Sequence, residues 1–387
     1  MRSTLPLATC VLLVSTVAWI RVPLLPDFGD ELSLSAATLG WVVAAFGVGR
    51  LLMDLPAGRL ADRLPPLYLF ALASLVMCIG SGLLAAANAA WIVLMSSFLL
   101  GVGSATSNTT GMATMSAVAT DDRRGSAMAL YSGSLLVGQA LGPALAGLLT
   151  SIGGWRTAAA AGGALALAVS AWAAFVGRRR RSDFEGEVRR RRERTPGAAL
   201  TGVQHLVLFG VAFSVFFTIG SMPQMLIPLI GADDLGLGIA AIGLALGAGG
   251  LARVAGAFGT GLVSDRISRR WALMPCLVVQ ALGVALLLVD GVHWWLLAII
   301  AMSLGSSGHA VGATMLGDRT SPAEVGRALG RYRFTGDLGL VAGPVLVALA
   351  YQHAGRDVAV LSVCAVLVVG LVSAAALLPE THSRLRS

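Results

Sequence analysis

Charged side chains stand inside long apolar stretches of this sequence, where ionisable groups are costly. Arg50 and Asp54 are four residues apart, and Arg333 and Asp337 repeat that spacing. On a helix, side chains four apart share a face, so each pair can form an ion pair. A charge at the centre of a bilayer costs at least about 2.5 kcal/mol, so such groups either pair structurally or serve a water-filled path.

Asp337 is the acid with the strongest indication of a chemical role. It lies roughly eleven residues into its stretch, which is about 17 Å at the rise of a helix. A carboxyl group at that depth can gain and lose a proton, and so bias two arrangements of the chain. For Arg50 and Asp54 a structural ion pair is the favoured interpretation. Arg253 has no acidic residue one helical turn away in the sequence.

Other reactive residue types form no recognisable cluster. The five histidines, at 205, 293, 309, 353 and 382, are scattered, and the four cysteines fall within apolar stretches without a C-x-x-C pair. A membrane-bound enzyme or sensor would need a cluster such as H-x-x-E-H. A nucleotide-binding G-x-x-x-x-G-K-[ST] loop is excluded because the sequence contains no lysine. We therefore predict no metal site, no cofactor and no enzymatic activity.

The stretches that hold these residues predict an all-helical integral membrane protein. Hydrophobic residues make up 56% of the chain and charged residues 12%, whereas a soluble domain is about a quarter charged. Continuous apolar runs such as Leu83–Leu100 exclude barrel strands, which alternate over about ten residues. A spanning helix needs roughly 20 apolar residues, and about twelve such stretches occur, near 5–25, 35–57, 67–87, 90–118, 127–150, 155–176, 200–230, 238–262, 271–290, 293–316, 325–350 and 356–378.

The arginines lie mostly in alternate loops. The intervening loops hold acids instead, among them Asp27, Asp30 and Asp233. This positive-inside pattern predicts that both termini are cytoplasmic. The net charge of +8 then reflects topology and contact with anionic lipid rather than a nucleic-acid partner. The Arg-rich segment 177–196 has almost none of the aromatic side chains that stack on bases.

The two halves of the chain repeat each other. We predict a six-helix bundle over 1–176, a cytoplasmic linker over 177–198 and a second six-helix bundle over 199–387. One set of matches is offset by 203 residues: Arg50, Gly58, Asp62 and Arg63 with Arg253, Gly261, Asp265 and Arg266. Another is offset by 201: Asn108, Gly111, Tyr131, Gly142 and Pro143 with His309, Gly312, Tyr332, Gly343 and Pro344. Two halves in the same orientation form a parallel repeat.

The segment Gly58–Arg63 resembles a loop motif of the major facilitator superfamily, G-x-L-a-D-R-x-G-R-[RK], between the second and third spans. The resemblance covers essentially the whole chain and implies a twelve-helix secondary transporter that works by alternating access. In that family the loop is a latch for the outward-open state. Its glycine would let two helices meet closely, and its aspartate would accept bonds from a helix N-terminus. A topology signal alone is the alternative.

The first copy of this loop departs from the family pattern. Pro65 and Pro66 stand where the later glycine and arginine are expected, so the first latch is predicted to be the weaker one. The second copy keeps Arg269 and Arg270 after Asp265.

The fifth span resembles the G-x-x-x-G-P-x-x-G-G signature of proton-driven exporters. It contains Gly138, Gly142, Pro143 and Gly147, with Ala146 in place of one glycine. Proline breaks the hydrogen-bond ladder and glycine admits close packing, so this helix could bend and seal. Ordinary small-residue packing is the alternative. The arginine that exporters often place in the fourth span is absent; Ser96 and Ser97 occupy that region.

The resemblance also implies a substrate cavity lined by the first, fourth, seventh and tenth spans. Its predicted lining residues are Arg21, Ser104, Asn108, Met115, Phe217, Met222, Gln224, His309 and Met315. For His309, a helix–helix hydrogen bond and a ligand contact are weighed equally. In the family the second and eleventh spans meet, which makes Arg50 the predicted partner of Asp337, with Arg253 or Arg333 as alternatives.

These observations predict proton-coupled export of small, fairly apolar, drug-like compounds. The predicted protein is a monomer in the bacterial cytoplasmic membrane. Uptake of a metabolite or an organic anion, with Arg21, Arg50 or Arg253 as the anion's partner, is the alternative.

Overall fold

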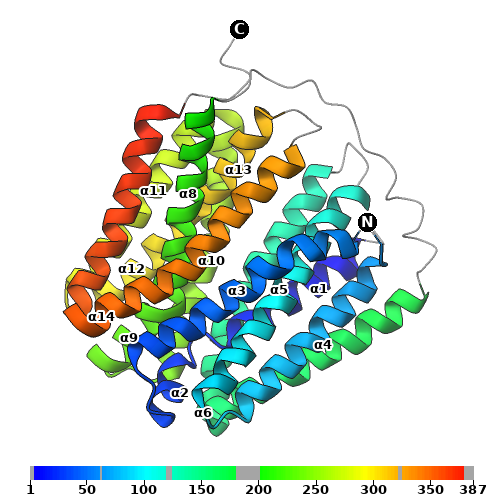
Figure 1. The fold of residues 1–387 in the computed structure, drawn as a ribbon, viewed down its shortest axis with the longest axis vertical. Helices are drawn as coiled ribbons and strands as arrows, with labels where there is room; N and C mark the ends of the chain where they lie inside the picture. The colour runs from blue at the N-terminus through cyan, green and yellow to red at the C-terminus, as the bar shows by residue number, and fades with distance from the viewer. Residues whose placement is uncertain (1–3, 62, 119–123, 180–200, 321–324, 379–387) are drawn as a thin grey trace. The chain divides into compact units, whose positions relative to one another are not determined.

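The computed structural model describes residues 4–61, 63–118, 124–179, 201–320 and 325–378. Within these ranges every regular secondary-structure element is a helix, and turns and short loops connect the helices (Figure 1). The chain divides into two compact units. The first holds residues 1–191 and 231–250, and the second holds 192–230 and 251–387. The domain boundaries predicted at 177 and 198 stay a prediction, and residues 231–250 belong by their contacts to the first unit.

The first unit is a bundle in which α5 packs against α3 and α4, and α6 packs against α1 and α4. Pro65 and Pro66 explain where α4 begins, because Pro66 occupies the first turn, where a missing N–H costs nothing. The helices are α1 (Thr4–Ile20), α2 (Leu25–Glu31), α3 (Ala36–Ala61), α4 (Pro66–Ala85), α5 (Ala90–Val118) and α6 (Arg124–Arg179).

Two of the helical segments contain two membrane crossings each. α6 breaks at Gly153–Gly154, and α14 (Val325–Leu377) breaks at Gly355. Gly154 and Gly355 have φ angles of 76° and 82°, a region that glycine enters readily. Ten of the described segments are long and apolar enough to cross a membrane, and these two measure 53 and 50 residues. Counting them twice gives twelve crossings, which confirms the predicted fold class.

The second unit is a bundle in which α8 packs on α14, and α11 packs on α12 and α14. A capping box starts α8: Thr201 Oγ1 accepts from the N–H of Gln204, and Gln204 Oε1 accepts from the N–H of Thr201. α10 runs from the first unit into the second. The helices are α8 (Gly202–Ser221), α10 (Ile239–Arg266), α11 (Arg269–Ala285), α12 (Val292–Gly305), α13 (His309–Asp318) and α14.

The predicted seventh and tenth spans are irregular. After α8 the chain passes through a wide π-type turn, η1 (Met222–Leu226), then α9 (Ile227–Leu229) and a second wide turn, η2 (Ile230–Asp234). Pro223 and Pro228 lack N–H groups and so interrupt the regular ladder here. Between α12 and α13 lies a tight turn, η4 (Ser306–Gly308), and another, η3 (Leu286–Leu288), follows α11.

Candidate functional site

Arg50 lies at a close crossing of α3 and α5 in the first unit. A Cβ atom on Gly49 would lie 2.2 Å from the carbonyl oxygen of Phe98, and one on Gly101 would lie 2.1 Å from that of Phe46. Only glycine lets the two backbones approach so closely. At this crossing Arg50 Nη1 donates a long hydrogen bond of 3.4 Å to Ser104 Oγ. The structure therefore brings together a predicted coupling residue and a predicted cavity residue.

Arg21 occupies the turn after α1 and is only 4% exposed. Its guanidinium carbon lies 4.3 Å from the centroid of the Phe46 ring on α3. A cation over an aromatic face is attracted by the ring quadrupole, and the attraction grows when water is excluded. The first unit thus holds a buried cation near the end of its first span.

The repeat predicted from the sequence has a direct counterpart in hydrogen bonding. Tyr131 Oη donates to the carbonyl oxygen of Asn108 at 3.0 Å, and Tyr332 Oη donates to that of His309 at 2.8 Å. Each glycine three residues further on makes room for the tyrosine. A Cβ on Gly111 would lie 3.0 Å from Tyr131 Cε2, and one on Gly312 would lie 2.5 Å from Tyr332 Oη.

His309 begins α13 and is half-buried. Its Nδ1 lies 2.9 Å from the carbonyl oxygen of Ser306, and because a carbonyl can only accept, Nδ1 must carry the proton. The Phe216 ring stands edge-on to the imidazole with centroids 5.6 Å apart. In the neutral form of the ring Nε2 is then the acceptor, and the bond observed at Nδ1 lies within its own span.

Gln224 and Phe217 lie in the irregular seventh span and are each 3% exposed. Pro223 cannot donate to the carbonyl of Ile219, and Gln224 Nε2 approaches that oxygen at 3.5 Å. A second carbonyl in this region, that of Ile227, accepts from Trp295 Nε1 at 3.2 Å. The predicted cavity residue Gln224 thus helps to satisfy a backbone that proline interrupts. The predicted lining methionines Met115, Met222 and Met315 are fully buried.

The fifth-span glycines make close contacts with α1. A Cβ on Gly138 would lie 2.3 Å from the carbonyl oxygen of Leu12, and one on Gly142 would lie 2.6 Å from that of Thr16. Gly147 instead faces Ala240, which belongs to the same unit, with a Cβ-to-oxygen distance of 3.0 Å. Pro143 lies inside α6.

The second half repeats this packing at two glycines, only one of which the sequence comparison identified. A Cβ on Gly339 would lie 2.3 Å from the carbonyl oxygen of Phe213, and one on Gly343 would lie 2.4 Å from that of Phe217. Gly339 is 201 residues after Gly138. A search for small residues at the repeat offset would have found it.

The loop motif is described mainly in its second copy. Asp265 Oδ1 accepts from Arg269 Nη1 at 2.6 Å, and the same nitrogen donates to Ser264 Oγ at 2.7 Å. Ser268 caps α11 by accepting from the N–H of Trp271, a cap that the sequence analysis missed although serine is favoured there. Arg266 is exposed.

In the first copy Asp62 lies outside the described residues, and Arg63 is exposed. At the loop glycines, Gly58 and Gly261, an added Cβ atom would meet no described atom within 4 Å. The close helix contact expected at these two glycines is therefore absent from the described part of the chain.

Asp337 is the most deeply buried carboxylate among the predicted site residues that the structure describes. It is 1% exposed and follows the start of α14 by twelve residues. Arg333 is half-buried one turn earlier, and Arg253 is half-buried in the part of α10 that belongs to the second unit. The side-chain oxygens of Asp54 on α3 are also buried. The ion pairs predicted for these residues stay predictions.

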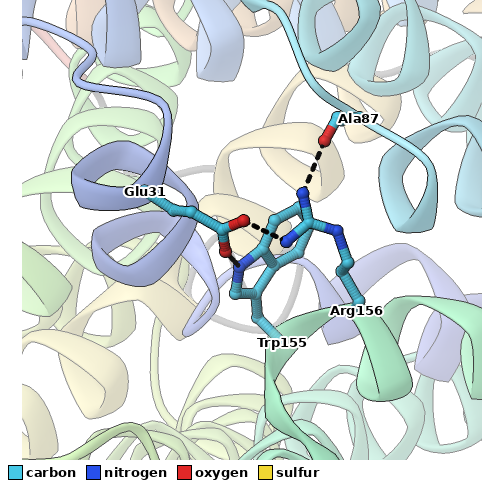
Figure 2. A network of polar contacts seen from close by, with 4 residues as sticks. All are labelled: Glu31, Ala87, Trp155 and Arg156. Carbon is cyan, nitrogen blue, oxygen red and sulfur yellow. Dashed lines mark hydrogen bonds and ion pairs between the residues drawn. The ribbon is translucent and has the colours of Figure 1, made fainter.

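A polar network that sequence analysis missed joins three connections of the first unit. Figure 2 shows Glu31 accepting from Trp155 Nε1, at 2.6 Å, and from Arg156 Nη1. Arg156 Nη2 donates to the carbonyl oxygen of Ala87 at 2.9 Å, and its guanidinium stacks 4.2 Å over the Trp155 ring. The arrangement fixes α2, the turn after α4 and the break in α6 to one another. The sequence signal that could have predicted this network is the pair of opposite charges, Glu31 and Arg156, in loops predicted to lie on the same side of the membrane.

These features define a multi-pass helical membrane protein made of two related units, each with charged side chains inside its spans. The sequence model of the Major Facilitator Superfamily matches residues 7–232 and 205–387. The chain belongs to this superfamily. The protein is a membrane transporter and not an enzyme.

Relatives of two kinds match the sequence. Over 132 residues the chain is 27% identical to multidrug resistance protein 2 of Bacillus subtilis (strain 168), covering 34% of this chain and 33% of that protein. The match therefore spans about a third of that relative's length. Over 362 residues it is 24% identical to the probable galactarate/D-glucarate transporter GarP of Escherichia coli (strain K12), covering 83% of this chain and 81% of that protein.

Solved structures with the same fold are also transporters. A bacterial homologue of the human lysosomal transporter Spinster, in an inward-facing and occupied conformation, has a TM-score of 0.73 at 17% identity and covers 97% of this chain and 93% of that one. A point mutant of the nucleoside transporter NupG has a TM-score of 0.74 at 13% identity and covers 97% of this chain and 100% of that one. At these identities the likeness concerns the fold alone.

Proposed function

We propose that this transporter exports small, fairly apolar compounds in exchange for protons, working by alternating access as a monomer in the bacterial cytoplasmic membrane. The observation that supports the proposal most is the burial of Asp337, which is 1% exposed inside a membrane-spanning helix. An ionisable group within a span is rare because it is costly, and such groups commonly serve ion or proton pathways.

The position of Asp337 gives it a means of coupling. Twelve residues from the start of α14 correspond to about 18 Å along a helix. At that depth the charged carboxylate needs a cationic partner, and protonation removes the need. We propose one of Arg50, Arg253 and Arg333 as that partner, with Asp54 modulating Arg50. Proton binding would then shift the balance between two conformations of the carrier.

The test is Asp337→Asn, which imitates the protonated acid without changing its size. In proteoliposomes the variant should still exchange or bind substrate but no longer move it against its gradient when a proton gradient is imposed. Asp357→Asn is the control, because Asp357 lies just after the break of α14 at Gly355 and its side chain is 68% exposed. Uphill transport with an unaltered pH dependence in Asp337→Asn would contradict the coupling role.

Export of apolar compounds is supported by the fifth-span glycines and by the partial likeness to a multidrug resistance protein. Gly138 and Gly142 hold α6 against α1 at distances that no larger residue permits. The substrate class is tested in cells stripped of their own exporters. Those cells are challenged with a panel of compounds, and accumulation is compared with and without a proton uncoupler. Lower accumulation that the uncoupler abolishes is the expected result.

Uptake of a metabolite or an organic anion is the second candidate function. It is supported by the buried Arg21 and by Arg50 at Ser104, and by the likeness to a protein named as a sugar-acid transporter over 83% of this chain. Under this alternative the cells would accumulate dicarboxylic sugar acids. Arg50→Gln would then abolish uptake while leaving the amount of protein in the membrane unchanged.

We also propose that both termini face the cytoplasm. The support is the arginine distribution, including the segment around Ser182, which lies outside the described residues. In a background without the four native cysteines, Ser182→Cys should react with an impermeant thiol reagent only after the membrane is opened. Asp233→Cys should react in intact cells. Labelling of position 182 from outside would reverse the orientation.

A further inference from the structure

A groove runs along the second unit between the first half of α8 and the last part of α14. Its volume is about 600 Å³, within the range of roughly 300–1,000 Å³ found for small-molecule sites. None of its lining residues is among the predicted cavity residues or the predicted coupling residues. Val203, Leu206, Gly210, Val369, Gly370 and Leu377 are among its lining residues.

The chemistry of the groove is that of a hydrocarbon site. Among its described lining residues the polar side chains are Ser214 and Ser373, and the hydroxyl of Ser214 donates to the carbonyl of Val211 at 3.0 Å. Leu206 and Val369 on the rim are 70% and 67% exposed. At Gly210 a side chain would meet no described atom within 4 Å, so this residue forms an open floor. A ligand here gains apolar contact and needs no hydrogen bonds along its length.

The length of the groove corresponds to one leaflet of a bilayer. From Val203 to Ser214 is eleven residues of α8, or about 17 Å at 1.5 Å per residue. On the other side it extends from Ala365 to Leu377, the last residue of α14. Half of a hydrocarbon core of about 30 Å is about 15 Å. The groove therefore starts at the ends of the two helices and has about the length of one leaflet.

Among the described residues, one arginine lies close to the end of the groove at Leu377. Arg270 is anchored there, donating from Nη2 to the carbonyl oxygen of Ala375, two residues before α14 ends. In the sequence the Arg-rich stretch 178–194 precedes α8, and Arg384 and Arg386 follow α14; most of these residues lie outside the described ranges. Arginines near a membrane surface attract anionic headgroups, at about 1 kcal/mol for each cation.

We propose that this groove binds one acyl chain of an anionic phospholipid, with the headgroup at the Arg-rich side of the membrane. In the orientation proposed above this is the cytoplasmic leaflet, but the binding itself does not depend on that orientation. The chain length matches the groove, the lining is apolar, and the charge at its mouth complements a phosphatidylglycerol headgroup. The site is separate from the coupling residues, so its failure would leave the proposed transport function standing.

The first experiment measures retained lipid by native mass spectrometry of the whole protein in mild detergent. With added phosphatidylglycerol the wild type should keep one molecule. Gly210→Phe should lower that affinity at least about tenfold, the change expected when the burial of about two methylene groups is lost. Gly82→Phe is the control, because Gly82 is also an exposed helical glycine with no described atom within 4 Å; it should bind as the wild type does.

Two further experiments complete the test. Arg270→Gln should keep one lipid but bind phosphatidylglycerol and phosphatidylethanolamine equally, whereas the wild type prefers the former. In the wild type, phosphatidylglycerol with a photoreactive acyl chain should label residues 203–214 and 365–377 above all other lipid-facing segments. Equal lipid retention by wild type and Gly210→Phe, evenly spread labelling, or a dimer that Gly210→Phe dissociates would each overturn the proposal.

Discussion

Replacing Gly142 by alanine adds a single methyl group at the contact between α6 and α1. The new carbon would lie 2.6 Å from the carbonyl oxygen of Thr16 and 2.8 Å from the Cβ atom of Trp19. Favourable contacts between carbon atoms lie at about 3.5–4.0 Å. Since the nearest of these atoms belongs to the α1 backbone, no side-chain rotation can relieve the clash, and the two helices must move apart.

The expected cost follows from overpacking a well-packed interface, which is typically about 1–3 kcal/mol. In a domain of 150–250 residues each kcal/mol shifts Tm by about 2–4 °C, so a fall of several degrees is expected. Gly133→Ala is the control on the same helix. No described atom lies within 4 Å of its Cβ position, and exchanging glycine for alanine in a helix should stabilise it by roughly 0.5–1 kcal/mol.

Thermal unfolding of the two purified variants in one detergent provides the assay. Gly142→Ala should unfold below the wild type and Gly133→Ala at or above it, so the two shifts differ in sign. The corresponding change in the second half, Gly343→Ala, should behave like Gly142→Ala, because its Cβ would lie 2.4 Å from the carbonyl oxygen of Phe217. If Gly142→Ala and Gly133→Ala unfold at the same temperature, the close approach of α6 and α1 is refuted.

Further substitutions test features of single units. Tyr131→Phe and Tyr332→Phe each remove one hydrogen bond to a helix carbonyl and should each lower the free energy of unfolding by about 0.5–1.5 kcal/mol; clearly unequal losses would count against the repeat as a structural symmetry. Arg156→Lys keeps the charge near Glu31 but loses the planar fork that also reaches Ala87, so Tm should fall, whereas the exposed Arg178→Lys should leave it unchanged. Asp62→Asn should slow transport without changing the amount of protein in the membrane; Asp265→Asn should slow it less if the family's asymmetry holds, and more if Pro65 and Pro66 weaken the first latch; normal rates in both variants would mean that the loop serves insertion alone.

The fold could be predicted from the sequence because lipid imposes a simple rule on it. Every crossing must be helical and about 20 residues long, so counting apolar stretches was sufficient. The breaks inside α6 and α14 were also foreseeable, since glycine precedes both predicted sixth and twelfth spans. The repeat was visible as matched residues and is confirmed by the paired bonds of Tyr131 and Tyr332.

The site was predicted less completely, for physical reasons. Arg50 and Ser104 were each identified but not their contact, because a contact between helices depends on how closely Gly49 and Gly101 let them approach. The Glu31–Arg156 network joins residues 125 positions apart in connecting segments that no periodic pattern places. The wide turns after α8 depend on how Pro223 and Pro228 are accommodated, which propensity alone does not specify.

The paired tyrosine bonds have a consequence for how such a protein can change over time. Both hydroxyls bind the main chain at positions 108 and 309, not the side chains there. The tyrosine hydrogen bond can therefore form whichever residue occupies the position. Asparagine stands there in one half and histidine in the other. In a duplicated scaffold of this kind, the side chain at this position can change in one half without a change in the other. The tyrosine hydrogen bond keeps the backbone in place while the new side chain makes different ligand contacts.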